Sequence, residues 1–373
     1  MGRGAADAAR PVELGKRHLT WWGDKGAVHM SDSSVADFFG RQAHEARGPE
    51  SERPTSMRGR RLRRIALATS LSLVVLAAGV VVAGYLTVNH YASSIPRISG
   101  IVALSAGRRP VMPVASRRSM TVLLTSSGAM PGGAGVPGAL IALVHFNAGG
   151  HGGAVVSIPA NSLVPVPGHG TTQLWQALKY GGPSLLIETV EDLTNVRIDH
   201  YSVMNFRGAA RLIGAMNGVN VDVPFPVTSD GYAFPAGLDH LTPATLLPYL
   251  RQANVSEVIR AELQGNLIRA MLGKIAADRM LVVTDVRLLH AMAAALSVDS
   301  SFSDAQLESL GLGLGRLPGR DGVFITAPTT GGPDGSAILT QEIAIQLWSA
   351  IRNDTVAQFA RRFPYTVTPD APA

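Results

Sequence analysis

The stretch PSLLIETVEDLTNVRIDHYSVMNFRGAARLIGAMNGVNVDV, residues 183–223, decides the fold class because its hydrophobic period changes repeatedly. Apolar residues at helical spacing predict a helix over 183–194. Short runs with β-branched residues predict strands over 200–205 and 219–223, and helical spacing returns between them over 206–216. Strands that alternate with helices favour an α/β sheet with helices on both faces.

The same alternation continues on both sides of this stretch. Further strands are predicted over residues 121–124, 140–146, 154–158 and 322–326. Further helices are predicted over residues 172–179, 242–251, 257–276, 286–296, 304–310 and 337–352.

An uncharged apolar run, IALATSLSLVVLAAGVVVAGYLTV, covers residues 65–88. As a helix it would extend about 36 Å, which is enough to cross a bilayer. Five arginines within residues 58–64 precede it, so the positive-inside rule predicts a single-pass anchor with a cytoplasmic N-terminus and an extracytoplasmic C-terminal domain. A cleaved signal peptide is the alternative, but the run is long and begins late for one.

The anchor divides the chain into segments of different character. Residues 1–64 form a polar, basic cytoplasmic tail that we expect to be disordered, although a short docking motif within it is an alternative. The remaining expected segments are a stalk and entry segment (89–117), an α/β domain (118–280), the C-terminal part of that domain or an accessory α/β region (281–363), and a disordered end (364–373).

Charge and cysteine content exclude several kinds of chemistry. The chain has no cysteine, which excludes disulfides and thiolate chemistry. Residues 1–64 carry most of the net charge of +6, so the folded part gives no sign of nucleic-acid binding. No Asp or Glu occurs between Glu52 and Glu188, and Lys179 is the only charge between Arg118 and Glu188. Carboxylate chemistry therefore cannot come from this interval.

Ordered motifs carry a specific resemblance. They include MTVLLTSS, LIALVHF, VSIPANSLVPVPGHG, ALKYGGPSLLIETVEDLTNVRIDHYSVMNF, FPAGLDHLTPATLLPYLRQ and IRAELQGNLIRAML, spread over residues 120–272. In this order they resemble the LytR–CpsA–Psr family of membrane-anchored extracytoplasmic proteins that attach glycopolymers to the cell wall. The resemblance implies an α/β fold built on a central mixed sheet, preceded by one transmembrane helix.

The resemblance also implies a reaction and its partners. A polyprenyl-diphosphate-linked glycan would give its sugar phosphate to a peptidoglycan hydroxyl, with the lipid held in an apolar tunnel. Arginines would clamp the diphosphate, because the planar guanidinium suits phosphate oxygens. Carboxylates would hold Mg²⁺ or accept protons, since phosphoryl transfer depends on positioning and charge neutralisation.

At most charged positions of the family motifs this chain carries other residues. Substituted motif positions in the first half are Gly128, Pro137, Ala139, Ala160, Asn161, Gln173 and Trp175. The ligand-binding loop would thus be formed by Ala160, Asn161 and Ser162, with Gln173 nearby. In the second half Arg251 and Arg260 remain as candidate diphosphate-binding catalytic residues, with Glu257 as a weaker candidate one turn before Arg260.

Three functions follow from this inventory. We favour a pseudoenzyme of cell-wall biogenesis that binds a polyprenyl-phosphate-linked glycopolymer while its catalysis is lost or impaired. The first alternative is an active glycopolymer–peptidoglycan phosphotransferase, for which Mg²⁺ would be the cofactor. The second alternative is a structural partner of an active homologue of the same family.

Other signals favour no separate site. The glycine-rich segments at 128–138 and 149–153 lack the phosphate-binding signatures, which favours loops. His145, His151 and His169 share no helical spacing and lack acidic neighbours, so no metal site is expected from them. The apolar stripe over 263–272 is expected to be core, and the family resemblance would let that face line a lipid tunnel.

Overall fold

The computed structural model describes residues 86–87, 89–101, 109–127, 140–149, 152–252, 255–277, 285–307, 310 and 322–368. All of them belong to the unit Leu73–Ala373. The predicted anchor over 65–88 lies outside the described residues apart from positions 86 and 87. Among the helices that the structure describes, none is both long and apolar enough to cross a membrane.

A mixed sheet forms the centre of the fold. Within the described residues it has seven strands, in the order β1-β12-β7-β2-β3-β4-β13. Their bounds are β1 Arg97–Ile98, β12 Leu296–Asp299, β7 His200–Asn205, β2 Met120–Ser127, β3 Ile141–Phe146, β4 Gly153–Ser157 and β13 Gly322–Thr326. β2 runs parallel to β7 and antiparallel to β3, and β4 runs antiparallel to β3 and parallel to β13. The mixed sheet expected from the resemblance is confirmed.

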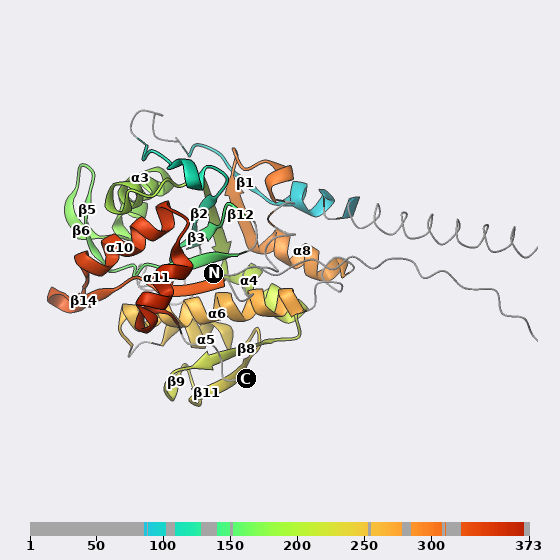
Figure 1. Cartoon of the computed structure of the whole chain (residues 1–373). Coiled ribbons are helices and arrows are strands. Elements are labelled where there is room, and N and C mark those ends of the chain that lie inside the picture. The colour runs from blue at the N-terminus through green and yellow to red at the C-terminus, as the bar shows by residue number, and fades with distance from the viewer. Residues whose placement is uncertain are drawn as a thin grey trace, which may run out of the picture. The chain divides into compact units, whose positions relative to one another are not determined.

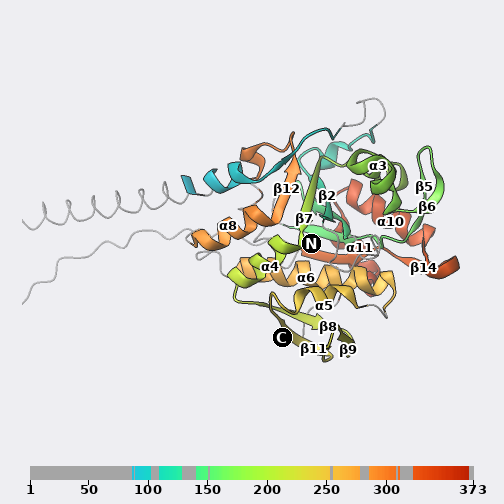
Figure 2. The ribbon, with the colours of Figure 1, turned by 180° about the vertical axis from the view of Figure 1, so that it is seen from behind.

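Side chains alternate between the two faces of this sheet, as a pleated strand requires. Leu123 and Val156 belong to a core with helices α3 (Gln176–Thr194), α10 (Gln341–Arg352) and α11 (Val356–Arg362). Their neighbours Val122 and Val155 belong to a core on the opposite face with α6 (Glu257–Ala277). Figures 1 and 2 show α3 and α10 on one side of the strands and α6 on the other. Helices on both faces are therefore confirmed.

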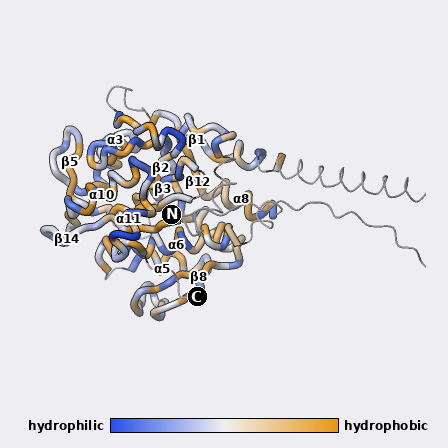
Figure 3. Tube along the Cα trace, in the orientation of Figure 1, coloured by the Kyte–Doolittle hydropathy of each residue, from blue (hydrophilic) through white to orange (hydrophobic). Residues whose placement is uncertain are grey.

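A separate hydrophobic core lies on the outer side of α6. It joins α6 to α4 (Phe206–Ala215), α5 (Leu246–Arg251), α8 (Val286–Ala295) and the hairpin of β8 (Val219–Val223) and β11 (Gly237–Leu241). In Figure 3 most of α8 takes the hydrophobic colours.

Short elements complete the described part. They are β5 Leu163–Val166, β6 Gly170–Gln173, β9 Val227–Ser229, β10 Tyr232–Phe234, β14 Thr329–Gly331, β15 Ala337–Leu339, η1 Val114–Ser116, η2 Pro333–Gly335 and η3 Pro364–Thr366. β5 pairs with β6, β9 with β10 and β14 with β15, each pair being antiparallel.

Three predicted helices begin too early. Residues 172–173 belong to β6, which pairs with β5, so α3 starts only at Gln176. Residues 337–339 form β15 before α10 begins. At 242–251 the backbone first makes a turn, in which the Thr242 N–H donates to Oγ1 of Thr245, and α5 starts at Leu246. In the first two cases, pairing with a neighbouring strand overrides the local helical pattern.

The motif YGGP places a break inside α3. Gly182 has φ 65° and ψ −158°, which is non-helical, and the helix resumes at Pro183. Glycine tolerates this conformation because it has no Cβ, and proline is favoured at the start of a helix. The predicted start of a helical segment at residue 183 is confirmed.

Candidate functional site

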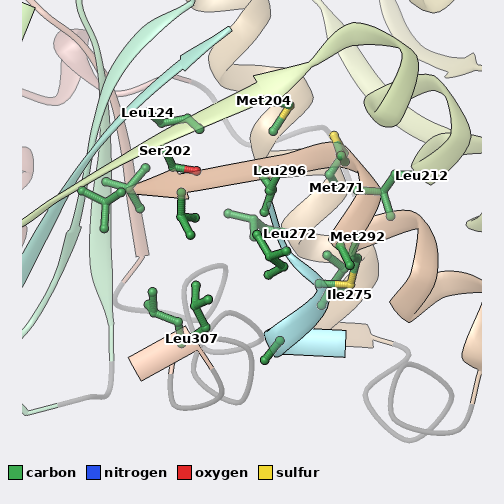
Figure 4. A pocket seen from close by; sticks show the side chains of 18 of the residues that line it. Leu124, Ser202, Met204, Leu212, Met271, Leu272, Ile275, Met292, Leu296 and Leu307 are labelled. Atoms are coloured by element: carbon green, nitrogen blue, oxygen red, sulfur yellow. The ribbon is translucent and has the colours of Figure 1, made fainter. Parts of the chain in front are cut away.

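An apolar cavity of about 230 Å³ lies between the sheet and helices α6 and α8. Strands contribute Val122, Leu124, Val144, Val155, Ser202 and Val298, and the helices contribute Ile268, Met271, Leu272, Ile275, Leu289 and Met292. Figure 4 shows Leu, Ile and Met side chains around the space, with the Ser202 hydroxyl as the one oxygen among the labelled side chains. No Asp, Glu, Lys or Arg occurs among its described lining residues. Such a lining suits a hydrocarbon chain and excludes a charged ligand.

The segment that follows the predicted anchor also lines this cavity. Residues 89–94 are helical, and Tyr91, Ala92 and Ile95 belong to the cavity wall. The Tyr91 ring meets that of His290 on α8 edge to face, with ring centres 6.2 Å apart. One wall of the cavity therefore comes from the residues directly after 65–88, the predicted membrane span.

A smaller cavity of about 30 Å³ adjoins the first one and shares Met204, Ile268 and Met271 with it. It brings two polar side chains, Ser126 at the end of β2 and Gln264 on α6. The Ser126 hydroxyl accepts a hydrogen bond of 2.9 Å from the backbone N–H of Leu140. The apolar space thus ends against neutral polar groups.

Hydrogen bonds to Asp299 hold the strand end beside the apolar cavity. The buried His200 ring lies 3.2 Å from Asp299 Oδ2 and stacks on Phe302, a lining residue. Burial by itself would raise the pKa of Asp299. Hydrogen bonds from His200, Ser301 and the Tyr201 N–H outweigh burial and lower the pKa to about 2. The carboxylate therefore remains ionised and fixes the position of β12 relative to β7.

Arg260 is buried and turned into the protein. Its Nη1 donates to the carbonyl oxygens of Leu250 and Arg251 at 3.0 and 2.9 Å. Its Nη2 donates to the Gln252 carbonyl at 3.2 Å, and its Nε donates to Glu257 at 2.9 Å. Carbonyls at the end of a helix lack intrahelical partners, and this guanidinium supplies them for α5. The structure therefore gives Arg260 and Glu257 a part in joining α5 to α6.

The guanidinium of Arg251 makes fewer hydrogen bonds than that of Arg260. Its Nη1 lies 3.3 Å from Asp230, and its side chain is 25% exposed. Its Nη2 is buried and has no hydrogen-bond partner among the described residues. Of the two arginines, Arg251 is the one with a donor left over for a ligand.

The predicted ligand-binding loop packs on the β14–β15 hairpin. Asn161 donates from Nδ2 to the Gly335 carbonyl at 2.7 Å, while its Oδ1 and the Ser162 hydroxyl are buried without a hydrogen-bond partner among the described residues. Gln173 accepts a hydrogen bond of 2.6 Å from the Trp175 indole. Ala160 is buried in the core.

No hydrogen bond or ion pair within the described part of the chain joins this loop to Arg251 or Arg260. The two halves of the predicted site therefore remain separate in their polar contacts. Gly128, Pro137 and Ala139 lie outside the described residues.

His145 and His169 contact side chains of the fold rather than one another. His145 is buried in β3, with Nδ1 3.0 Å from the Thr121 hydroxyl and Nε2 3.2 Å from Asp354. The ring of His169 stacks on Tyr180 at 4.3 Å between ring centres, and His151 lies outside the described residues. No group of three or more His, Asp or Glu that could hold a metal occurs among the described residues.

Sequence reasoning found only one side of the cavity. The stripe over 263–272 does line it, through Ile268, Met271 and Leu272. The walls from α8 and from residues 91–95 were missed. The signal available for α8 was its composition, VRLLHAMAAA, which is apolar on most sides and is typical of a helix covered by other elements.

The sequence of this chain is similar to a known protein family and to several of its members. The LytR_cpsA_psr family profile matches residues 113–318, more than half of the chain. The chain is 30% identical over 154 residues to the polyisoprenyl-teichoic acid–peptidoglycan teichoic acid transferase TagU of Enterococcus faecalis. That match covers 40% of this chain and 50% of the relative. It is also 36% identical over 99 residues to the probable cell wall biosynthesis protein LcpB of Corynebacterium glutamicum, covering 26% of this chain and 24% of that one. The chain thus spans about half or less of these relatives.

Solved structures share the fold. A LytR-Csp2A-Psr enzyme from Actinomyces oris matches with a TM-score of 0.53 at 19% identity, over 69% of this chain and 96% of that one. A structure described as TagT bound to LI-WTA matches with a TM-score of 0.50 at 24% identity, over 68% and 99% of the two chains. The sequence match and the shared fold agree: this chain belongs to the LytR–CpsA–Psr family.

Proposed function

We propose that this chain is a membrane-anchored, extracytoplasmic protein of cell-envelope biogenesis that binds a polyprenyl-phosphate-linked glycopolymer, with catalysis lost or impaired. The observation that carries the proposal is the apolar cavity, whose described lining residues are uncharged and which ends at Ser126 and Gln264. A polyprenyl chain would gain free energy by burial there, at roughly 25 cal/mol per Å² of apolar surface.

The inventory of charges supports impaired catalysis. A diphosphate needs several cations, yet Arg260 already satisfies three backbone carbonyls and Glu257. Moving it to a ligand would leave those carbonyls without a partner, at about 1–3 kcal/mol for each buried group. Arg251 alone provides little neutralisation of a diphosphate.

An active phosphotransferase is the second candidate. The unpartnered Nη2 of Arg251 favours it, because a buried guanidinium donor without a partner suggests a place for an anionic ligand. The names of the relatives also favour it, since TagU is a teichoic acid transferase.

The experiment uses the full chain in detergent micelles. Binding of polyprenyl phosphate is measured first, and release of polyprenyl phosphate from a polyprenyl-diphosphate glycan is then followed with Mg²⁺ and peptidoglycan present. Lipid binding without turnover is the expected result. Turnover that disappears in Arg251→Ala would overturn the loss of catalysis. Absence of lipid binding would leave a structural partner of an active homologue as the function.

A further inference from the structure

A third cavity, of about 500 Å³, lies where β13 ends and α10 begins, beside the first turns of α6. We call it the threonine cavity, since it is lined by Thr326, Thr329, Thr340, Thr366 and Thr368 together with Glu262. All of its lining residues except Val258 and Glu262 lie beyond residue 318, where the family match ends. It shares no lining residue with the apolar cavity.

The side-chain hydroxyl of Thr326 lacks a hydrogen-bond partner among the described residues. Its Oγ1 is buried and makes no hydrogen bond within the described part of the chain. A buried hydroxyl without a partner costs free energy, so native structures rarely retain one unless another group completes it. A hydroxyl both donates and accepts, so a turn of this side chain towards the cavity would let a ligand hydroxyl satisfy it in either sense.

Glu262 adds a carboxyl group with an altered proton affinity. Burial, together with the negative charge of Asp222, raises its pKa, and the more weakly acting Arg269 opposes this. Such a carboxyl holds its proton to a higher pH than usual. The oxygens of this carboxyl group accept hydrogen bonds from the hydroxyl groups of a neutral ligand.

The rest of the lining excludes an anion and suits a ring with apolar faces. No Lys or Arg lines the cavity among the described residues. Val258, Ile343 and Pro364 supply apolar contacts, and Tyr365 lines the cavity with 70% of its surface exposed. A sugar ring has hydroxyl edges and C–H faces, and an exposed aromatic ring presents a flat, rigid surface to such a face.

The three cavities follow one helix. Going along α6, Val258 and Glu262 line the threonine cavity, Gln264 and Leu267 line the small one, and Ile275 lines the apolar one. At 1.5 Å per residue, Glu262 and Ile268 are separated by about 9 Å along the helix axis. The threonine cavity therefore lies nearest the N-terminal end of α6, and the apolar cavity extends furthest towards its C-terminal end.

We propose that the threonine cavity is a saccharide-binding site that takes a neutral, hydroxyl-rich sugar ring. The proposal rests on the proposed function, because the apolar cavity would hold the lipid end of the same kind of molecule. The ring could belong to the lipid-linked glycan or to a peptidoglycan strand, and the chemistry of recognition is the same for both.

The test measures binding to the full chain in detergent micelles by calorimetry. The probes are polyprenyl phosphate, a polyprenyl-diphosphate N-acetylglucosamine disaccharide and a soluble, uncharged N-acetylglucosamine oligosaccharide fragment that represents the peptidoglycan strand. The variants are Thr326→Val, Glu262→Gln and Tyr365→Ala, with Thr228→Val at the exposed position of β9 as the matched control. Thr326→Val removes a hydroxyl that has no partner, and Tyr365→Ala changes an exposed ring, so both variants should fold.

Each of the three variants is expected to weaken saccharide binding by about three- to tenfold, the equivalent of one lost hydrogen bond or ring contact. Binding of polyprenyl phosphate should stay unchanged in all of them, as should every affinity of the control. A loss confined to the lipid-linked disaccharide assigns the site to the donor glycan. A loss confined to the soluble fragment assigns it to peptidoglycan.

Two results would contradict the proposal in different ways. If the wild-type chain binds polyprenyl phosphate but no saccharide probe, or if the variants bind saccharide as the wild type does, the saccharide site is wrong and the lipid-binding function stands. If polyprenyl phosphate does not bind but the fragment binds through Thr326, the lipid-binding function fails and the saccharide site stands alone.

Discussion

Arg260 ties two helices together through the backbone of one of them. Its guanidinium donates to the carbonyls of Leu250, Arg251 and Gln252, and Glu257 balances its charge. Both members of the pair are largely buried, with side-chain exposures of 7% and 17%. Removing one member of such a pair costs more than the pair itself contributes, because the other groups are left unsatisfied.

Replacing Arg260 by Ala should therefore lower the free energy of unfolding by about 3 kcal/mol even without ligand. Urea unfolding of the full chain in detergent measures this, with Arg287→Ala as the control. Arg287 is 88% exposed and pairs with Asp285 on its own helix end, so its loss should change stability little. Unchanged stability in Arg260→Ala together with lost ligand binding would instead make Arg260 a ligand-binding residue.

Asp299 gives the stability a dependence on pH. Its folded pKa of about 2 lies below the usual 3.8, so its contribution is fully present above about pH 4 and is lost as the pH falls towards 2. Asp299→Asn should cost roughly 2 kcal/mol at neutral pH and flatten the acid side of the stability profile. Unfolding midpoints from pH 7 to pH 2.5 test this. Asp192→Asn, on the exposed surface of α3, should leave the profile as in the wild type.

At the scale of elements, α4 and α8 pack unusually closely at Gly208. A Cβ at this position would lie 2.3 Å from the Ala295 Cα and 2.7 Å from the Ala294 carbonyl oxygen. Both are backbone atoms, so neither can move without shifting α8. The two Asn205 Nδ2 hydrogen bonds to Ala294 and Ala295, at 2.9 and 3.2 Å, hold the same contact.

Gly208→Ala should destabilise the fold by about 1–3 kcal/mol through overpacking. Gly273→Ala in α6 is the matched comparison, because a Cβ there meets nothing within 4 Å. It should instead stabilise by up to about 1 kcal/mol, since alanine favours the helix. Thermal unfolding of the two variants measures both changes. Equal effects of the two substitutions would contradict a close α4–α8 contact at Gly208.

Elements with a clear local pattern were predicted from the sequence, whereas elements that lack one and form only through a distant partner were not. The strands over 200–205, 219–223 and 322–326 agree with β7, β8 and β13. Leu296, predicted as the last residue of a helix, belongs to β12 because it pairs with Met204 of β7. β1 exists through its pairing with Val298 and Asp299, about 200 residues away. Local periodicity carries no information about such partners.

At the scale of the whole described domain, the apolar cavity is assembled from residues 91–95, five strands, α6, α8 and the side chains of Phe302, Leu307 and Leu310. These parts lie far apart in the chain, and each contributes ordinary core residues. A ligand that fills the cavity would therefore contact several elements at once and should stabilise them together.

Polyprenyl phosphate should raise the unfolding midpoint, with a stabilisation of about 2.7 kcal/mol at a free concentration of 100 times its Kd. Ala293→Phe places a ring in the cavity wall and should abolish this increase, while Ala233→Phe at an exposed position of β10 should preserve it. Differential scanning calorimetry in detergent provides the measurement. An equal increase in Ala293→Phe would place the lipid elsewhere.

The sequence by itself determined the family, the alternation of strands and helices, the apolar stripe of α6 and the near absence of charge between Arg118 and Glu188. These properties follow from residue type and spacing, which act locally along the chain. Only the tertiary structure decided that Arg260 donates to the carbonyls that end α5, and that Thr326 lines the threonine cavity together with Glu262. Hydrogen-bond partners and cavities depend on which distant surfaces meet. The packing on both faces of the central sheet determines which surfaces meet, and no single sequence motif contains this information.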